Sequence, residues 1–105
     1  MANIANTPKP PYYAVIFTSI RTKTDPSYNK MAERMVELAI KQPGFLGMES
    51  AREEVGITVS YWDSLDAIKH WKMNSEHLEA QQKGHHTWYS SFKVRITKVE
   101  KDYGI

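Results

Sequence analysis

The segment at residues 12–21, YYAVIFTSIR, constrains the fold of this chain more than any other stretch. Its β-branched and aromatic residues predict a strand, in which successive side chains point to opposite faces of a sheet. Both faces are apolar, with Tyr13, Val15 and Phe17 on one side and Tyr12, Ala14 and Ile16 on the other. A sheet covered on one side only would show a polar face here, so we expect both faces of this strand to be covered.

A helix is predicted after this strand. Asp25-Pro26 is a typical helix start, because aspartate caps free N–H groups and proline has φ preset for the first turn. Pro43-Gly44 is a typical helix end. Between them, apolar residues recur at helical spacing on one face: Tyr28, Met31, Ala32, Met35, Leu38 and Ala39.

Two further strands are predicted at residues 45–52 and 57–62, joined by a hairpin turn at 53–56. Asp63 or Ser64 is expected to cap a short helix that buries Leu65, Ile68 and Trp71. Asn74-Ser75 is expected to interrupt this helix near Met73 and to start a third helical segment that runs towards Trp88.

Residues 90–99 alternate as a final strand, with Phe92, Val94 and Ile96 inward and Arg95 on the opposite face. The order strand, helix, strand, strand, split helix, strand is the α+β ferredoxin-like plan. It predicts a four-stranded antiparallel sheet with both helical segments on one face. Because the other face would then be bare, the two-sided first strand predicts a homodimer.

Composition narrows the domain organisation and the function classes. Residues 1–11 are polar with three prolines, so we expect a flexible leader before a single domain at 12–105. The net charge of +2 comes from scattered residues, which predicts no nucleic-acid partner. No long apolar run or secretory signal is present, so we expect a cytoplasmic protein without a membrane partner. The absence of cysteine excludes disulfides and thiolate metal sites.

The chain resembles the antibiotic biosynthesis monooxygenase-like family of the dimeric α+β barrel superfamily. The resemblance rests on YWDSLDAIKHW at 61–71, SEHLEAQQKG at 75–84 and WYSSFKVRITKVEKDYG at 88–104. It implies a homodimer with a pocket between sheet and helices in each subunit. Relatives include cofactor-independent oxygenases of phenolic polyketides and quinols, so the resemblance implies a monooxygenase that needs no cofactor and acts on a small aromatic compound.

Two alternatives stay open. The heme-degrading branch of the family uses an asparagine on the first strand, a tryptophan ending the second helix and a histidine on the third. Trp71 stands at the tryptophan position, while Gln81 or Gln82 falls at the histidine position and residues 12–21 contain no asparagine. Heme binding or degradation is therefore one alternative, and a non-catalytic dimeric module that binds a small ligand is the other.

Six candidate ligand-binding residues accompany one candidate base. His85 is the candidate base, because imidazole titrates near neutral pH. The other candidates could stack on a planar ligand or hydrogen-bond to its oxygens: Trp71, Tyr61, Tyr13, Gln82, Trp88 and Arg95. Ordinary packing or solvation is the competing interpretation for each. No histidine pair has metal-ligand geometry with a nearby carboxylate, so no metal site is predicted.

Overall fold

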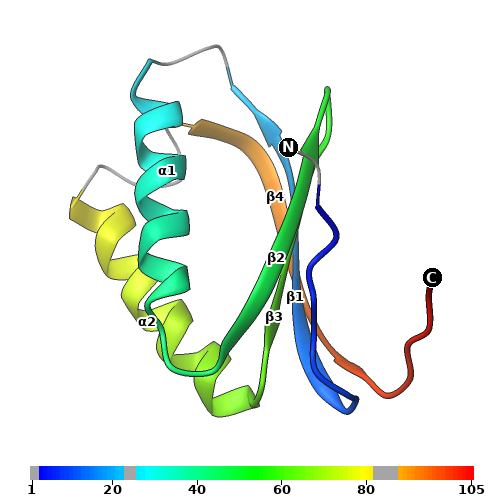
Figure 1. Ribbon diagram of the computed structural model, residues 1–105. Coiled ribbons are helices and arrows are strands. Elements are labelled where there is room, and N and C mark those ends of the chain that lie inside the picture. The colour runs from blue at the N-terminus through cyan, green and yellow to red at the C-terminus, as the bar shows by residue number, and fades with distance from the viewer. Residues whose placement is uncertain (1–2, 23–25, 82–87) are drawn as a thin grey trace.

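The computed structural model describes residues 3–22, 26–81 and 88–105. Its elements in chain order are β1 (Tyr12–Arg21), α1 (Pro26–Ile40), β2 (Phe45–Arg52), β3 (Gly56–Trp62), α2 (Leu65–Gln81) and β4 (Tyr89–Val99). The strands form one antiparallel sheet in the order β2-β3-β1-β4, and both helices cover the same face (Figure 1). This arrangement confirms the predicted α+β ferredoxin-like fold.

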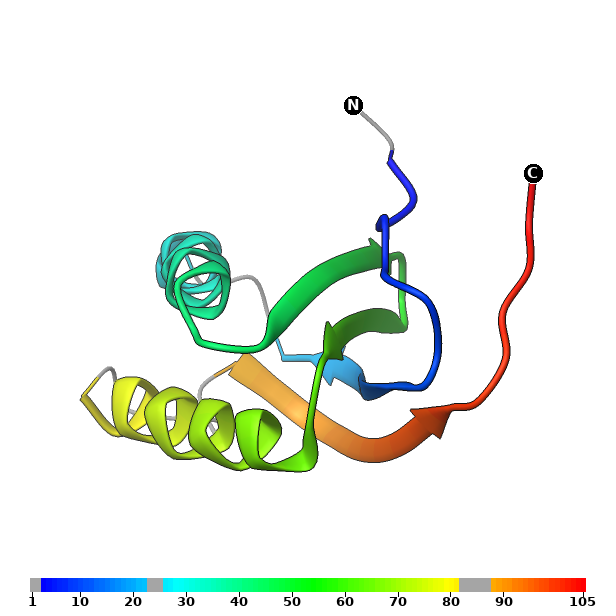
Figure 2. The ribbon, with the colours of Figure 1, turned by 60° about the horizontal axis from the view of Figure 1, so that its bottom comes forward.

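The two faces of the sheet differ in what covers them. The helix-facing side carries the β1 residues Tyr13, Val15, Phe17 and Ser19, since Val15 packs with Ala67 and Ile68 of α2. The other face, called the back face here, lies on the side of both chain termini (Figures 1 and 2). Antiparallel pairing shows which residues of the other strands lie on each face of the sheet, because residues directly opposite each other share a face.

The helix-facing side contains two groups of buried apolar residues. The Trp62 cluster joins the sheet to α2, with Tyr13, Phe45 and Trp71 packed against Val15, Trp62, Ala67 and Ile68. The Trp88 cluster joins the two helices to the start of β4, with Tyr28, Met35, Leu38 and Tyr89 packed against Met31, Leu78 and Trp88. The predicted apolar face of the first helix is thus confirmed.

Local signals account for the ends of the helices. Ser64 caps α2, because its Oγ accepts a hydrogen bond from the Ala67 N–H at 3.1 Å. Gly44 has a φ of +86°, a conformation that glycine adopts without strain, and it follows the last turn of α1. The Asp63 N–H donates to the Gly44 carbonyl at 2.9 Å, which ties the end of α1 to the start of α2.

The predicted interruption at Asn74-Ser75 is wrong, because α2 continues through both residues to Gln81. Their side chains hydrogen-bond back to the helix instead of recapping it. Asn74 Nδ2 donates to the His70 carbonyl and Ser75 Oγ donates to the Lys72 carbonyl, each at 3.0 Å. Such back-bonding lets short polar side chains remain inside a helix.

Two expectations of burial are also wrong. Leu65 is 55% exposed, because it lies at the first position of α2 on the outer side of the turn. On β4, Phe92, Val94 and Ile96 face the helix-facing side but remain 43–52% exposed. They lie on β4, the edge strand of the sheet, and their exposed fractions show that the helices do not cover them fully.

The terminal segments cover part of the back face. Residues 3–11, the described part of the predicted leader, contain no helix or strand and run along the sheet (Figure 1). The Ala5 N–H donates to Glu49 Oε2 at 2.8 Å, and Tyr12 OH donates to Asp102 Oδ2 at 2.5 Å. Tyr12 and Ala14 are consequently buried within one chain. Further along the same face, Ile20 and Ile57 remain 46% and 45% exposed.

Candidate functional site

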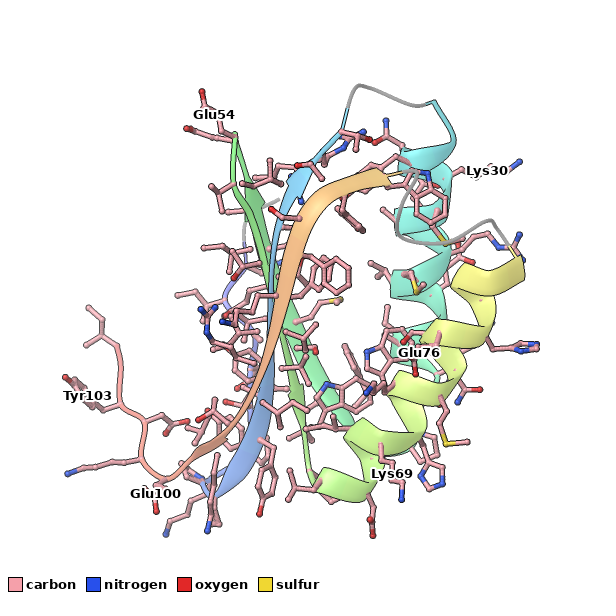
Figure 3. All side chains as sticks on the ribbon, turned by 180° about the vertical axis from the view of Figure 1, so that it is seen from behind. Lys30, Glu54, Lys69, Glu76, Glu100 and Tyr103 are labelled. Atoms are coloured by element: carbon pink, nitrogen blue, oxygen red, sulfur yellow. The ribbon has the colours of Figure 1, made fainter. Side chains whose placement is uncertain are left out.

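Small side chains line the middle of the helix-facing side. On β3, this side carries Gly56, Thr58 and Ser60 before the large ring of Trp62. Ser60 is buried, and its Oγ accepts the Trp62 indole N–H at 2.9 Å. Side chains from the sheet and the helices project into the layer between them (Figure 3). Because these β3 residues are small, the sheet contributes little side-chain volume to this part of the layer.

Four aromatic rings form a continuous group beside these small residues, and we call Phe17, Tyr28, Tyr89 and Phe92 the aromatic cluster. Phe17 meets Tyr89 edge-on at 5.4 Å and lies 5.6 Å from Phe92 between ring centroids. Tyr89 also meets Tyr28 edge-on at 5.9 Å. Such spacings are favourable for aromatic pairs and present ring faces and edges to a planar neighbour.

A row of paired residues that contains Arg52 and Ser19 crosses the sheet next to the aromatic cluster. Arg52 on β2 pairs with Gly56 on β3, Gly56 pairs with Ser19 on β1, and Ser19 pairs with Phe92 on β4. The Arg52 side chain lies over Gly56, where an added Cβ would overlap the guanidinium. Its Nη2 donates a hydrogen bond to the Oγ of the buried Ser19. Glycine at position 56 is therefore required for this path of the arginine.

A second guanidinium lies at the same end of the molecule. Arg21, the last residue of β1, stacks on Tyr28 with its Cζ 3.6 Å from the ring centroid. The Arg52 Cζ lies 6.0 Å from the same centroid. Contacts of this kind between a guanidinium and an aromatic ring are favourable. Tyr28 thus lies against two positive charges.

Three predicted site residues lie on the helix side of the sheet, but they do not converge. Trp71 is half-buried and stacks on Trp62 with centroids 5.8 Å apart. Tyr13 packs against the same Trp62 cluster. Trp88 is buried in the other cluster, with Met31 and Leu78. Trp71 and Tyr13 therefore share one group of buried residues, and Trp88 belongs to the other.

Two other predicted site residues lie on the back face. Tyr61 pairs with Ala14, and its OH donates to Glu49 Oε1 at 2.7 Å. Burial and the adjacent Glu49 carboxylate, which accepts the hydrogen bond of the phenol, raise the pKa of Tyr61 to about 12. Arg95 pairs with Ile16, on the opposite face from Val94, as the alternation predicted. Neither side chain faces the helices.

Hydrogen bonds also tie Tyr12, the first residue of β1, to the segments at both ends of the chain. The Tyr12 OH bonded to Asp102 also accepts from Thr7 Oγ1 at 2.9 Å. The Asp102 carboxylate raises the pKa of Tyr12, because it accepts a hydrogen bond from the protonated phenol. This arrangement holds the terminal segments against the sheet, which is a structural role.

His85 and Gln82 lie outside the described residues, so their predicted roles stay predictions. Among the residues that are described, no group of three or more histidine, cysteine, aspartate or glutamate side chains could hold a metal ion. Within the same part of the chain, no helix has the length and apolarity required to cross a membrane.

The sequence interpretation missed Ser19, Arg52 and Tyr28 as members of a polar and aromatic site. A serine near the end of an apolar strand and an arginine before a turn have ordinary structural explanations when each is considered alone. The informative signal is Gly56, which starts β3 in register with both residues. That register was not available from the sequence.

Two open depressions lie around the β2–β3 hairpin. One is lined by Ala51, Arg52, Glu53, Glu54, Val55 and Ile57. The other is lined by Thr18, Ser19, Ile20, Val55, Ser91, Phe92 and Lys93. Most of the strand residues in both lists point to the back face. These depressions therefore belong to the back face and to the hairpin end of the sheet.

Comparisons with known proteins agree with this architecture. The family model for antibiotic biosynthesis monooxygenase matches residues 11–83. The uncharacterized protein YqjZ of Bacillus subtilis is 56% identical over 100 residues, covering 93% of this chain and 88% of that protein.

Solved structures show the same fold at low sequence identity. SnoaB, described as a cofactor-independent oxygenase from Streptomyces nogalater, is similar with a TM-score of 0.72 at 10% identity, covering 89% of this chain and 97% of SnoaB. PA3566 from Pseudomonas aeruginosa is similar with a TM-score of 0.68 at 13% identity, covering 90% of this chain and 98% of PA3566. From the family-model match and the high identity to YqjZ, we conclude that the chain belongs to the antibiotic biosynthesis monooxygenase family.

Proposed function

We propose that this protein is a cofactor-independent monooxygenase acting on a small phenolic or quinol-like aromatic compound held between the sheet and the helices. Family membership supports a monooxygenase-type role, and the structurally similar SnoaB is described as a cofactor-independent oxygenase. The observation that carries the proposal is the aromatic cluster beside the small residues of β3. A flat aromatic substrate would stack on these rings in a layer from which water is largely excluded.

The proposed chemistry needs a base, hydrogen bonds to an anion and a dry site. For a carbon acid such as an anthrone, the base removes a proton and the resulting anion passes one electron to dioxygen. The radical pair combines to a peroxide, and loss of water from the peroxide leaves a new carbonyl. One oxygen atom ends in the product and the other in water, so no external reductant is required.

We assign the base to His85, whose imidazole can take a proton near neutral pH. Trp88, which precedes Tyr89 of the aromatic cluster, and Gln82 are proposed to line the substrate, the first as a wall and the second as a hydrogen-bonding group. Trp71 and Tyr13 belong to the Trp62 cluster and would form the far wall of the same layer. Arg95 and Tyr61 belong to the face away from the helices. In this proposal they therefore take part in contacts at the back face and do not touch the substrate.

An oxygen electrode tests this function directly. Purified protein is mixed with a panel of anthrones and hydroquinones, and dioxygen uptake is followed. We expect at least one compound to be consumed well above its uncatalysed rate. His85→Ala should reduce that rate by a factor of roughly 100 or more, as is typical when a general base is lost. His70→Ala is the matched control, because His70 is exposed on α2. No uptake with any compound would reject the proposed function.

The heme alternative is separable by a hemin titration in the same buffer. Two residues suggested heme binding in the sequence. Trp71 is stacked on Trp62, and His85 lies outside the described residues. We expect no shifted Soret band at stoichiometric protein. A saturable band with a defined stoichiometry would favour heme binding over the cofactor-independent reaction.

We further propose that residues 12–105 act as one domain and that two copies pair through their back faces. Exposed Ile20, Val55 and Ile57 gather at the hairpin end of that face. Burial of such an apolar group against a second copy would remove it from water, at roughly 25 cal/mol per Å² of apolar surface. A closed twofold contact of this kind is the commonest form of oligomer.

A further inference from the structure

The pair of guanidiniums at the end of the helix-facing side is not explained by the fold. Arg52 lies over Gly56 and donates to Ser19, while Arg21 stacks on Tyr28. Both arginines are half-buried. Because Tyr28 lies 3.6 Å from one Cζ and 6.0 Å from the other, the two charges are no farther apart than the sum of these distances.

Neither charge is neutralised by the described part of the chain. No ion pair or hydrogen bond joins Arg21 or Arg52 to a carboxylate among the described residues. In sequence, Glu53 and Glu54 follow Arg52 in the exposed turn of the hairpin, and the acidic residue nearest to Arg21 is Asp25, which lies outside the described residues. Glu54 stands at the tip of the hairpin and points away from the helices (Figure 3). Two guanidiniums that share one ring repel each other, and neither can lose its proton in a protein.

An anion at this point would relieve that repulsion. A guanidinium presents planar, forked N–H donors that match a carboxylate, often through two parallel hydrogen bonds. Arg52 uses Nη2 for Ser19 and retains further donors, since the group carries five N–H bonds. Its path across the sheet is fixed by Gly56 on one side and by the buried Ser19 at its end. The donor is therefore held in place before a ligand arrives.

The aromatic rings next to the two arginines indicate the chemistry of the rest of the ligand. Tyr28, which contacts both guanidiniums, is continuous with Tyr89, Phe17 and Phe92 through ring contacts of 5.4–5.9 Å. Phe92 is 43% exposed, so the cluster can be reached from the open edge at β4. A ligand with a carboxylate on an aromatic body would place its charge at the arginines and its rings on this cluster.

We propose that Arg52 and Arg21 bind the carboxylate of an acidic aromatic ligand whose ring system packs on the aromatic cluster. The inference rests on the proposed function in taking this ligand as the substrate class. It narrows that class from phenolic compounds in general to those that carry an acid group. Arg52 is the principal contact, and Tyr28 positions Arg21 beside it.

Binding can be measured without turnover. Isothermal titration calorimetry compares naphthoate with the uncharged, similarly shaped naphthamide on the full-length protein. We expect naphthoate to bind roughly tenfold or more tightly than naphthamide, in the range of a charge-assisted hydrogen-bonded pair. Arg52→Gln should weaken naphthoate binding much more than naphthamide binding and so remove most of that preference, because only the carboxylate loses a charge-assisted hydrogen bond. Arg34→Gln is the matched control, since it removes the same charge from an exposed position on α1.

The outcomes separate this inference from the proposed function. Equal binding of acid and amide to the unmodified protein would overturn the carboxylate site, as would naphthoate binding that Arg52→Gln leaves unchanged. If Arg52→Gln fails to fold, judged by near-ultraviolet circular dichroism, Arg21→Gln and the acid–amide comparison on the unmodified protein still decide. Arg52-dependent binding without dioxygen uptake on any substrate supports the site and rejects the monooxygenase. Dioxygen uptake with neutral substrates, together with equal binding of acid and amide, would support the monooxygenase and reject the carboxylate site.

Discussion

Glu49 connects two parts of the chain at the scale of single residues. One carboxylate oxygen accepts the Ala5 N–H at 2.8 Å, and the other accepts the Tyr61 OH at 2.7 Å. A single acidic side chain thereby holds both the N-terminal segment and a strand phenol on the back face. Removal of one donor leaves part of a half-buried carboxylate without its partner, which is more costly than the loss of one ordinary hydrogen bond.

Tyr61→Phe tests this arrangement. We expect the free energy of unfolding to fall by about 1 kcal/mol at neutral pH, the typical contribution of a side-chain hydrogen bond. Urea unfolding followed by tryptophan fluorescence measures it. A variant as stable as the unmodified protein would contradict a stabilising role for this contact.

The same phenol predicts a pH dependence. Its pKa is raised from 10.0 to about 12 in the folded state, so folded Tyr61 keeps its proton where the unfolded chain loses it. The resulting stability is fully present below pH 10 and is lost as the pH rises towards 12. The difference in stability between the unmodified protein and Tyr61→Phe should therefore shrink over that interval. A constant difference would contradict the raised pKa.

Single residues also show which features the sequence predicts and which contacts it does not. Alternation correctly separated Arg95 from Val94, because one-residue steps along a strand exchange faces whatever the fold. Arg52 and Ser19 lie thirty-three positions apart, and their contact depends on the register of three strands. No local pattern encodes that register, so this part of the site could not be predicted.

At the scale of elements, local chemistry predicted most boundaries. Capping at Ser64 and the glycine at position 44 act within a few residues, so they can be recognised in the sequence. Asn74-Ser75 shows the limit of such rules. The same polar side chains that cap a helix also bond back to carbonyls within one, and packing of Leu78 into the Trp88 cluster favours continuation.

Two serines, Ser64 that caps α2 and Ser75 inside it, give a matched test of these opposite roles. Ser64→Ala should reduce stability by about 1 kcal/mol, because the Ala67 N–H loses its cap. Ser75→Ala should change stability by less than about 0.5 kcal/mol, since it lies within the helix and alanine favours helix. Thermal or urea unfolding of both variants measures the contrast. A Ser75→Ala loss as large as that of Ser64→Ala would indicate that α2 does begin again there.

For the molecule as a whole, the order of the helices and strands predicts the fold. The same order does not predict which segments cover the back face. The two apolar faces of the first strand predict cover on both sides, and the back face is covered at Tyr12 and Ala14 but exposed at Ile20. Part of that cover comes from residues 3–11 of the same chain, which the composition gave no reason to expect. The remaining exposed apolar group at Ile20, Val55 and Ile57 is where pairing with a second copy is predicted.

Light scattering at micromolar concentration tests that pairing, and we expect twice the 12.1 kDa mass of one chain. Ile57→Glu should shift the protein towards monomer, because a charge buried at an apolar contact is strongly unfavourable. Leu65→Glu is the control, since Leu65 is exposed on α2 away from the back face. A monomeric unmodified protein, or a dimer unaffected by Ile57→Glu, would contradict pairing through this face.

The central claim is that the protein itself transfers one atom of dioxygen to an aromatic substrate without a cofactor. Mass spectrometry of the product formed from an anthrone under isotopically heavy dioxygen tests it, with chelator-treated protein free of absorbance from heme or flavin. We expect one heavy oxygen atom in the new carbonyl, at a rate that depends on His85. Product whose new oxygen comes from water, or whose formation requires an added metal or cofactor, would contradict it.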